Sequence, residues 1–279
     1  MKITFIGGGN MACALISGLL KQGYAADQIC VIEINDESRI RISERFGVLT
    51  AADLANGITP CPSDRAGGAD NVIVLSVKPQ QLHAVAQQLK GMLDQHLVIS
   101  IAAGIRTTDI MRWLDGYRRV IRTMPNTPSL VGAGVTGLYA SSNASAQDRQ
   151  AAELIMQAVG AVLWVEDEEM LHAVTAISGS GPAYVFYFIE SLQQAGMELG
   201  LTANEARQLT LQTFCGAVKL ANESSEDAAV LRARVTSTGG TTQQAIQSMD
   251  MNEVKSKIIA AINAANVRSR EMSDEFSKL

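Results

Sequence analysis

The chain has 279 residues, a net charge of −5, 47% hydrophobic residues and 18% charged residues. This composition is typical of a folded globular protein of one or two domains, and it excludes a disordered chain or a basic nucleic-acid-binding protein. Four cysteines lie far apart, at Cys13, Cys30, Cys61 and Cys215, so we expect reduced thiols in the cytoplasm. The histidines lack metal-binding spacing and the apolar runs are shorter than the ~20 residues that span a bilayer, so we expect neither a metal nor a membrane.

The first dozen residues form the motif around which the chain is organised. An apolar run at residues 2–6 precedes a glycine cluster, and a helical apolar pattern follows it. In this strand–turn–helix context, a match to G-x-G-x-x-[GA] predicts dinucleotide binding. Gly7 can adopt the backbone of a tight turn, Gly9 lets a pyrophosphate approach, and Ala12 allows close helix packing. An ordinary glycine-rich turn is the alternative, and the flanking strand and helix make it less favourable.

The end of the second expected strand is where such a fold contacts the adenosine ribose of the cofactor. We expect this strand over residues 28–34, and residues 33–39 read Glu-Ile-Asn-Asp-Glu-Ser-Arg. A carboxylate here favours the free 2′-hydroxyl of NAD, whereas Ser, Asn or Arg suits the 2′-phosphate of NADP. Both kinds of side chain are present, with Asn35 as our candidate contact, so the sequence leaves the cofactor preference open.

Helices and strands alternate up to residue 165, which predicts a mostly parallel, doubly wound sheet. We expect strands at 72–77, 97–101, 119–122, 134–140 and 161–165, and helices at 38–46, 80–93, 107–114 and 146–159. The irregular stretch at 48–68 is expected to form short strand fragments and a surface loop. Ligands bind beyond the carboxyl ends of such strands. Three strand ends carry Lys78-Pro79, Ala102-Ala103-Gly104 and Pro125-Asn126-Thr127, so we expect these loops to line one crevice.

The second part of the chain, residues 166–279, contains no convincing strand and forms by our interpretation an all-helical domain. We expect helices at 170–177, 182–199, 204–222, 225–235, 242–249 and 252–277. Thr202 and Glu205 have the spacing of a capping box at the start of one of them. Several of these helices are apolar over wide faces, which predicts an interlocked homodimer that covers them.

Two stretches of small residues, 177–184 and 235–242, each lie directly before an expected helix. Loops of this kind display free backbone N–H groups and hydroxyls to which a carboxylate or phosphate can bind. Either stretch alone is better explained by a helix-capping loop without a ligand. Both together, in a chain with a dinucleotide turn, favour a small anionic substrate. The sequence offers no Ser–His–Asp pattern, no helical lysine paired with a nearby asparagine and no metal cluster. Reduction of an electrophilic iminium requires no such base.

Six motifs, in order over essentially the whole chain, resemble the pyrroline-5-carboxylate reductase family. They are residues 7–12 (GGGNMA), 77–79 (VKP), 101–104 (IAAG), 122–128 (RTMPNTP), 178–184 (SGSGPAY) and 236–242 (TSTGGTT). The resemblance implies reduction of 1-pyrroline-5-carboxylate to L-proline by NAD(P)H, the last step of proline biosynthesis. It also implies an α/β Rossmann domain at 1–165 followed by an all-α dimerisation domain at 166–279, with dimers that often assemble into rings.

The resemblance assigns roles to individual positions. Cofactor contacts are expected for Gly7, Gly8, Gly9, Asn10, Met11, Ala12, Asn35, Val77, Lys78, Pro79, Ala102, Ala103, Gly104, Met124, Pro125 and Asn126. Substrate contacts are expected for Val235, Gly239, Gly240, Thr241 and Thr242. The backbone of 239–241 would bind the substrate carboxylate, and the Thr242 hydroxyl would be the catalytic contact beside the ring nitrogen. Many relatives have proline where this chain has Thr238, a departure that removes no functional group. NADPH is the expected cofactor, with NADH possible, and the partner chain is an alternative source of the 239–242 loop.

Two further functions remain as alternatives. A β-hydroxyacid dehydrogenase-like protein, or another imine reductase, shares the N-terminal fold. The dehydrogenase needs a catalytic lysine on the helix after a G-x-x-G loop, and the helix after Gly181 begins Pro-Ala-Tyr-Val-Phe without one. A non-catalytic NAD(P)-binding scaffold would have no use for a carboxylate-binding loop at 239–242. We therefore predict an imine reductase that forms proline.

Overall fold

A computed structural model describes residues 1–58 and 71–279. They form two compact units, one of Met1–Ser180 with Ala265–Leu279 and one of Gly181–Ala264. The expected domain boundary between residues 165 and 166 stays a prediction. The last helix, α12 (Val254–Phe276), contributes residues to both units.

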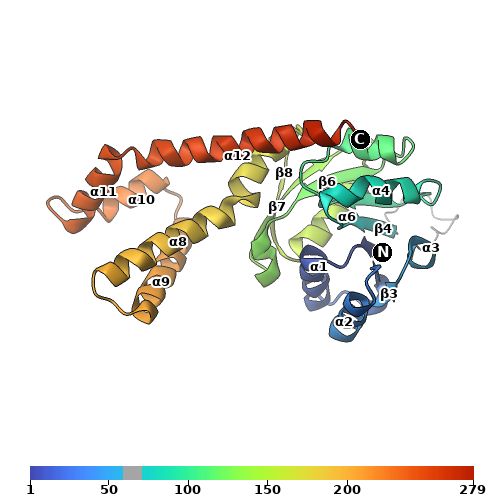
Figure 1. The fold of residues 1–279 in the computed structure, drawn as a ribbon, viewed down its shortest axis with the longest axis horizontal. Coiled ribbons are helices and arrows are strands. Elements are labelled where there is room, and N and C mark those ends of the chain that lie inside the picture. Colours follow the sequence, from blue (N-terminus) through green and yellow to red (C-terminus); the bar gives the residue numbers. More distant parts are fainter. Residues whose placement is uncertain (59–70) are drawn as a thin grey trace. The chain divides into compact units, whose positions relative to one another are not determined.

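An eight-stranded sheet forms the centre of the first unit (Figure 1). Its strands are β1 (Lys2–Ile6), β2 (Ile29–Ile32), β3 (Leu49–Ala51), β4 (Asn71–Leu75), β5 (Leu97–Ser100), β6 (Val120–Met124), β7 (Gly134–Ala140) and β8 (Gly160–Trp164). Their order is β3-β2-β1-β4-β5-β6-β7-β8. Only the β6–β7 pair is antiparallel among the described strands. The predicted mostly parallel, doubly wound sheet is therefore confirmed.

Helices cover both faces of this sheet because its strands are apolar on both sides. The helices are α1 (Asn10–Lys21), α2 (Asp36–Phe46), α3 (Leu54–Gly57), α4 (Pro79–Leu89), α5 (Thr107–Trp113) and α6 (Ala146–Gln157). One buried core joins the sheet to α1, α2 and α6, and it includes Phe5 and Val74. The other joins it to α4, α5 and the end of α12, and it includes Ile73 and Leu75. Adjacent residues of β4 thus enter opposite cores, as alternation along a strand requires.

The described part of the segment between α2 and β4 agrees with the expected short strand fragments at β3 but adds a helix, α3, that we did not expect. It contains the short strand β3 and the one-turn helix α3, whose first turn is capped by the Asp53 carboxylate at 2.9 Å from the Asn56 N–H. Residues 59–70, with Cys61, lie outside the described residues. The second strand is also shorter than expected, because Gln28 belongs to a 3₁₀ turn at Ala26–Gln28 and the strand ends at Ile32 rather than at Ile34.

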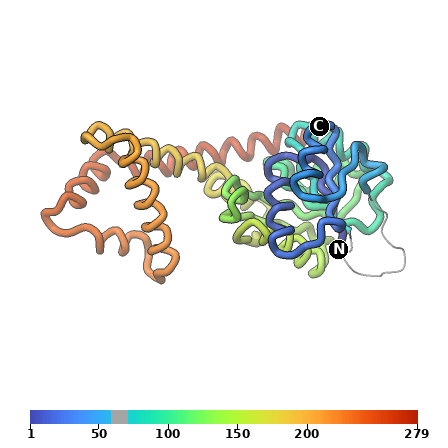
Figure 2. The backbone as a smooth tube through the Cα atoms, turned by 90° about the horizontal axis from the view of Figure 1, so that it is seen from below, coloured from blue at the N-terminus to red at the C-terminus, as the bar shows by residue number. Residues whose placement is uncertain are grey.

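The second unit is entirely helical, and Figure 2 traces its course. Its helices are α8 (Gly181–Glu198), α9 (Ala203–Glu223), α10 (Ala228–Arg234), α11 (Thr241–Met251) and the first part of α12. The predicted capping box is confirmed, since Thr202 Oγ1 accepts from the Glu205 N–H and Glu205 Oε2 accepts from the Thr202 N–H. Across the described residues, no helix combines the length and apolar character that a membrane crossing requires.

This helical unit buries very few of its side chains. Within Gly181–Ala264, only Gly196, Ala206 and Thr210 are buried. Large apolar side chains remain exposed along its helices, among them Val185, Phe186, Tyr187, Leu192, Leu209, Val218, Leu220 and Ile259. An exposed apolar surface of this extent is typical of an interface rather than of a free surface.

The expected loop at residues 177–184 was wrong, because the chain there is helical. Helix α7 (Met170–Val174) leads into a π-helical turn at Thr175–Gly179, and α8 follows. The Ser180 N–H donates to the Thr175 carbonyl at 2.8 Å. The backbone groups that we expected to be free therefore lie in a helix. Small residues suit both a flexible loop and a tightly packed helix, and their sequence does not distinguish the two.

Candidate active site

The glycine turn after β1 has the geometry that a dinucleotide requires. Gly7 has a φ of +98°, and a Cβ there would lie 2.9 Å from the Ser76 carbonyl oxygen. A Cβ on Gly9, in contrast, would meet no atom within 4 Å. The fold itself thus requires glycine at position 7, whereas the space beside Gly9 is open to a ligand. Ala12 is buried where α1 packs on the sheet.

Helix α1 begins at this turn without a side-chain cap. Gly9 is its N-cap residue, and no side chain accepts a hydrogen bond from the first turn, which starts at Asn10 and Met11. That turn also lacks an acidic side chain. Free N–H groups with the positive end of a helix dipole bind phosphates. The residues present therefore fit a pyrophosphate.

The strand ends that follow lie side by side along the same edge of the sheet. Strands β1, β4, β5 and β6 are parallel neighbours, so the loops after them meet at their carboxyl ends. The Ser76 hydroxyl lies 2.9 Å from the Ile6 carbonyl oxygen and 2.7 Å from that of Gly7, and it joins the first two loops. Val77 and the exposed Lys78 follow, and Pro79 starts α4.

The loop after β5 holds the candidate residues Ala102, Ala103 and Gly104. The Ala102 N–H donates to Ser100 Oγ at 3.3 Å, and Gly104 has a φ of +78°. The Gly104 carbonyl accepts a hydrogen bond of 2.7 Å from Ser273 Oγ on α12. This loop is thus fixed at its start by its own strand and at its end by the C-terminal helix.

The loop after β6 is fixed by the π-helical turn at Thr175–Gly179, where we had expected a glycine-rich loop. Met124 packs against Gly179, where a Cβ would lie 2.5 Å from Met124 Cε. Asn126 is buried beside Pro125; its Nδ2 donates to the Ser178 carbonyl at 3.2 Å and its Oδ1 accepts from the Val135 N–H at 3.0 Å. In a regular helix the Ser178 carbonyl would accept from residue 182, which is proline and has no N–H. Asn126 supplies the missing donor.

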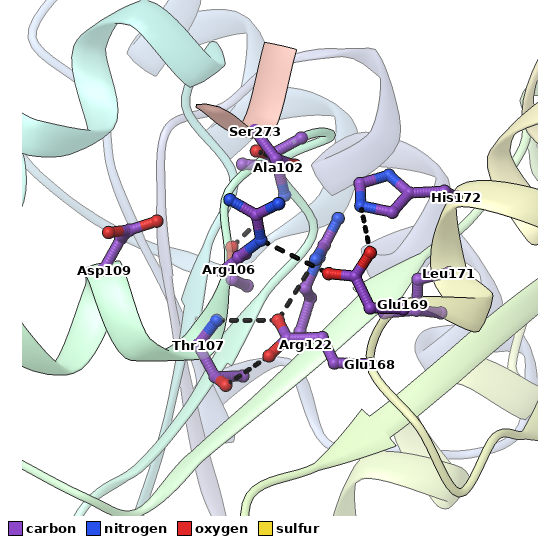
Figure 3. Close-up of polar contacts among 12 residues, drawn as sticks. Ala102, Arg106, Thr107, Asp109, Arg122, Glu168, Glu169, Leu171, His172 and Ser273 are labelled. Carbon is purple, nitrogen blue, oxygen red and sulfur yellow. Dashed lines mark hydrogen bonds and ion pairs between the residues drawn. The ribbon is translucent and has the colours of Figure 1, made fainter. Parts of the chain in front are cut away.

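A buried cluster of charged residues lies beside these loops (Figure 3). Arg122 of β6 is 1% exposed, and its Nη1 lies 3.1 Å from Glu168 Oε1. Glu168 also accepts from the Thr107 N–H and hydroxyl, each at 2.7 Å, at the start of α5. Sequence reasoning missed this cluster. The only signal was an arginine inside an apolar strand and an acidic run at 166–169.

A second set of charges surrounds the buried His172 next to this cluster (Figure 3). Its Nδ1 lies 2.8 Å from Ser269 Oγ and its Nε2 lies 3.7 Å from Glu169 Oε2. Glu169 also pairs with Arg106 and Arg270. Burial lowers the pKa of His172, the positive charge of Arg122 lowers it further, and Glu169 opposes both. The imidazole is therefore held neutral within a charged surrounding.

The candidate substrate residues belong to the second unit. Val235 and Thr241 are exposed and Thr242 is half-buried. Gly239 has a φ of +74°, and its N–H donates to Gln243 Oε1 at 2.5 Å. Gly240 is the N-cap residue of α11, with no side-chain cap and no acidic residue in the first turn. The first turn of α11 can thus receive a carboxylate, although the N–H groups of Gly239 and Gly240 are already paired, the latter with the Ser237 carbonyl at 3.1 Å.

Metal binding finds no support in the described part of the chain, where no group of three His, Cys, Asp or Glu side chains is arranged around a common point. Cys13, Cys30 and Cys215 are free thiols.

Comparison with known proteins decides the family. A family model described as pyrroline-5-carboxylate reductase dimerisation matches residues 168–272. One described as NADP oxidoreductase coenzyme F420-dependent matches residues 2–104. The chain is 42% identical over 278 residues to the pyrroline-5-carboxylate reductase of Pseudomonas aeruginosa, which covers 99% of this chain and 98% of that protein. The chain belongs to the pyrroline-5-carboxylate reductase family.

Other relatives and solved structures agree. The pyrroline-5-carboxylate reductase of Haemophilus influenzae is 41% identical over 278 residues, which cover 98% of each chain. The structure of the pyrroline-5-carboxylate reductase from Coxiella burnetii has a TM-score of 0.88 at 42% identity, covering 98% of each chain. The Plasmodium falciparum pyrroline carboxylate reductase with NADP bound has a TM-score of 0.82 at 26% identity, again over 98% of each chain.

Membership of the pyrroline-5-carboxylate reductase family confirms the main functional prediction over the β-hydroxyacid dehydrogenase-like alternative. It also confirms an α/β Rossmann domain followed by a helical dimerisation region. The chain is a nicotinamide-dependent oxidoreductase. The roles of the individual site residues stay predictions.

Proposed function

We propose that this chain reduces 1-pyrroline-5-carboxylate to L-proline with NAD(P)H, the last step of proline biosynthesis. The single observation that carries the proposal is its likeness, over nearly its whole length, to the P. aeruginosa pyrroline-5-carboxylate reductase. The uncapped start of α1 beside the open Gly9 supports it, because this is where the cofactor pyrophosphate must bind.

The cofactor contacts that we propose all lie on the first unit. Residues 7–12 bind the pyrophosphate, Asn35 lies toward the adenosine ribose, and residues 77–79, 102–104 and 124–126 flank the nicotinamide and its ribose. The adjacent ends of β1, β4, β5 and β6 support this assignment. The bound cofactor supplies a hydride to the carbon of the substrate C=N bond. These loops orient the nicotinamide and the substrate toward each other and exclude water. For an already electrophilic iminium, this orientation and exclusion of water contribute much of the rate acceleration.

The substrate contacts that we propose lie at the start of α11. The uncapped N–H groups of Thr241 and Thr242 bind the substrate carboxylate. The N–H groups of Gly239 and Gly240 join them only if they leave their present acceptors, Gln243 Oε1 and the Ser237 carbonyl. Val235 lies at the start of this loop. The Thr242 hydroxyl forms a hydrogen bond with the ring nitrogen and is the one catalytic side chain that we assign.

The oligomer that we propose is a homodimer built through the helical unit, in the cytoplasm, with rings of dimers as a further level. An apolar groove of about 510 Å³ lies between α8 and the first part of α12, lined by Tyr184, Tyr187 and Phe188 on one side and Ile258 and Ala261 on the other. A second copy would cover it and give the nearly coreless helical unit the burial that it lacks.

The cofactor that the family resemblance favours is NADPH, with NADH as the second candidate. An NADP-bound relative, from P. falciparum, supports a nicotinamide dinucleotide with a 2′-phosphate for that protein. The residues after β2 bear directly on the choice for this chain.

The experiment that tests the function is a loss of absorbance of NADPH or NADH on addition of 1-pyrroline-5-carboxylate to the purified chain. 3-Hydroxy acids and their keto forms should cause no turnover. Thr242→Ala should lower kcat about tenfold or more while leaving cofactor affinity unchanged, and Thr242→Ser should restore much of kcat. No substrate-dependent loss with either cofactor would refute the function, and an equal loss of cofactor binding in Thr242→Ala would refute the role of Thr242.

A further inference from the structure

The acidic residue at the end of β2 is held against the glycine turn. Glu33 follows β2 directly, and its Oε2 accepts from the Gly8 N–H at 2.9 Å while its Oε1 accepts from the Asn35 N–H at 2.9 Å. Its backbone N–H donates to Ala51 on the neighbouring strand β3. The carboxylate is therefore fixed in place, next to the open approach at Gly9.

The position of Glu33 is that of the adenosine ribose in a dinucleotide-binding fold. An acid at the end of this strand binds the ribose 2′-hydroxyl of NAD. A carboxylate has about four acceptor sites, and the N–H groups of Gly8 and Asn35 occupy two of them. The remaining two can accept from the ribose hydroxyls. A 2′-phosphate at the same place has only acceptors and a negative charge to offer, and a carboxylate repels both.

The start of α2 gives a 2′-phosphate no compensation. Asn35 Oδ1 already accepts from the Ser38 N–H at 2.8 Å, so the helix is capped. Asp36 adds a negative charge in the first turn. The Arg39 guanidinium is divided between Asp36 Oδ1, at 2.6 Å, and the Glu33 carbonyl, at 2.9 Å. The donors and the positive charge at this helix end are thus already paired with groups of the same chain.

Two other arginines lie further along α2. Arg41 and Arg45 line a pocket of about 570 Å³ together with Gly8 and Asn10. Arg41 Nη2 donates to Ser38 Oγ at 2.9 Å, and the Arg45 guanidinium lies 4.8 Å from the centre of the Phe46 ring. Both have partners already and begin a full turn beyond Asn35, whereas Glu33 lies at the ribose position itself.

We propose that Glu33 is the residue that determines cofactor specificity and that it makes this reductase prefer NADH over NADPH. This preference rests on the proposed nicotinamide-dependent reduction. It differs from the NADPH that the family resemblance implies, because the acid and the self-paired α2 start are features of this chain.

The test measures direct binding of NADH and of NADPH to the purified chain, with the fluorescence of the reduced cofactor as the readout. The kcat/KM for each cofactor is measured in parallel. The wild type should bind NADH about tenfold or more tightly than NADPH. Glu33→Gln keeps an acceptor for the Gly8 N–H and removes the charge, so NADPH should gain about tenfold in affinity and NADH should lose a few-fold. Asp27→Asn is the matched control; it removes one exposed charge at the opposite end of β2 and should leave the ratio unchanged.

Each other outcome has a defined meaning. A wild type that prefers NADPH, with the preference lost in Arg41→Gln, would overturn the proposal and assign the 2′-phosphate to the arginines. An unchanged NADH-to-NADPH ratio in Glu33→Gln would also overturn it. If the variant fails to fold, the wild-type ratio alone decides. Binding of neither cofactor would instead refute the proposed function.

Discussion

The Ser273 hydroxyl donates a hydrogen bond of 2.7 Å to the Gly104 carbonyl oxygen, although 169 residues separate the two. Ser273 is fully buried on α12, and Met272 beside it lies 3.3 Å from where a Gly104 Cβ would be. The C-terminal helix thus fixes a loop that we assign to the nicotinamide.

Ser273→Ala should affect both stability and cofactor binding. The Gly104 carbonyl would lose its partner in a buried place, which costs about 1–3 kcal/mol, and the loop would loosen. We expect a lower free energy of unfolding in urea. We also expect the KM for the cofactor to rise over the wild-type value by more than the KM for the substrate does. Ser269→Ala is the control, because it removes another buried hydroxyl of α12 that pairs with His172 instead. Equal cofactor effects in both variants would contradict a specific role for Ser273.

Glu168→Gln should be strongly destabilising. The change preserves an acceptor for Thr107 but leaves the buried Arg122 guanidinium without its counter-charge. Removing one partner of a buried ion pair costs about 3–5 kcal/mol. Urea unfolding should show a loss of this order, whereas Glu166→Gln, at an exposed position of the same acidic run, should change little. A loss below about 1 kcal/mol would mean that water reaches the pair.

Substitutions at Gly7 and Gly9, the two outer glycines of the turn, should affect different properties. Gly7→Ala should lose about 1–3 kcal/mol of stability, because the side chain is strained at a φ of +98° and overlaps the Ser76 carbonyl. Gly9→Val should fold with a change of about 1 kcal/mol or less, since the position is extended and open. Its affinity for the cofactor should nevertheless fall about tenfold or more. Thermal melting and cofactor titration of both variants separate the two effects, and normal binding by Gly9→Val would place the pyrophosphate elsewhere.

The buried His172 should make stability depend on pH. Burial and the charges of Arg122, Arg270 and Arg106 lower its pKa, against the pull of Glu169. Below about pH 6.5 the unfolded chain therefore takes up a proton that the folded chain does not. The full free energy of unfolding is present above that pH. It decreases as the pH falls toward the folded-state pKa, by up to about 1.4 kcal/mol per pH unit. Urea unfolding between pH 7.5 and 5 should show this loss, and His172→Asn should reduce it. The same pH dependence in the variant would assign it to other groups.

Much of the fold could be predicted because local patterns determine it. Strand β7 was expected at 134–140 and has those bounds, and the capping box of Thr202 and Glu205 is present. The direction of β7 could not be predicted, since the pairing of β6 with β7 is set by the path of the intervening chain rather than by composition. The small residues at 177–184 were misjudged for a related reason. Their helix is stabilised by Asn126 and Met124, which are remote in sequence.

The sequence by itself determined the glycine turn, the alternation of strands and helices, and the family to which the chain belongs. These depend on residue types at fixed short spacings, where backbone freedom and hydrophobic period act locally. Only the tertiary structure decided which remote groups meet: Ser273 with Gly104, Arg122 with Glu168, and the Glu33 carboxylate with the Gly8 N–H. Such pairs form when packing brings distant segments together, and no local pattern specifies them.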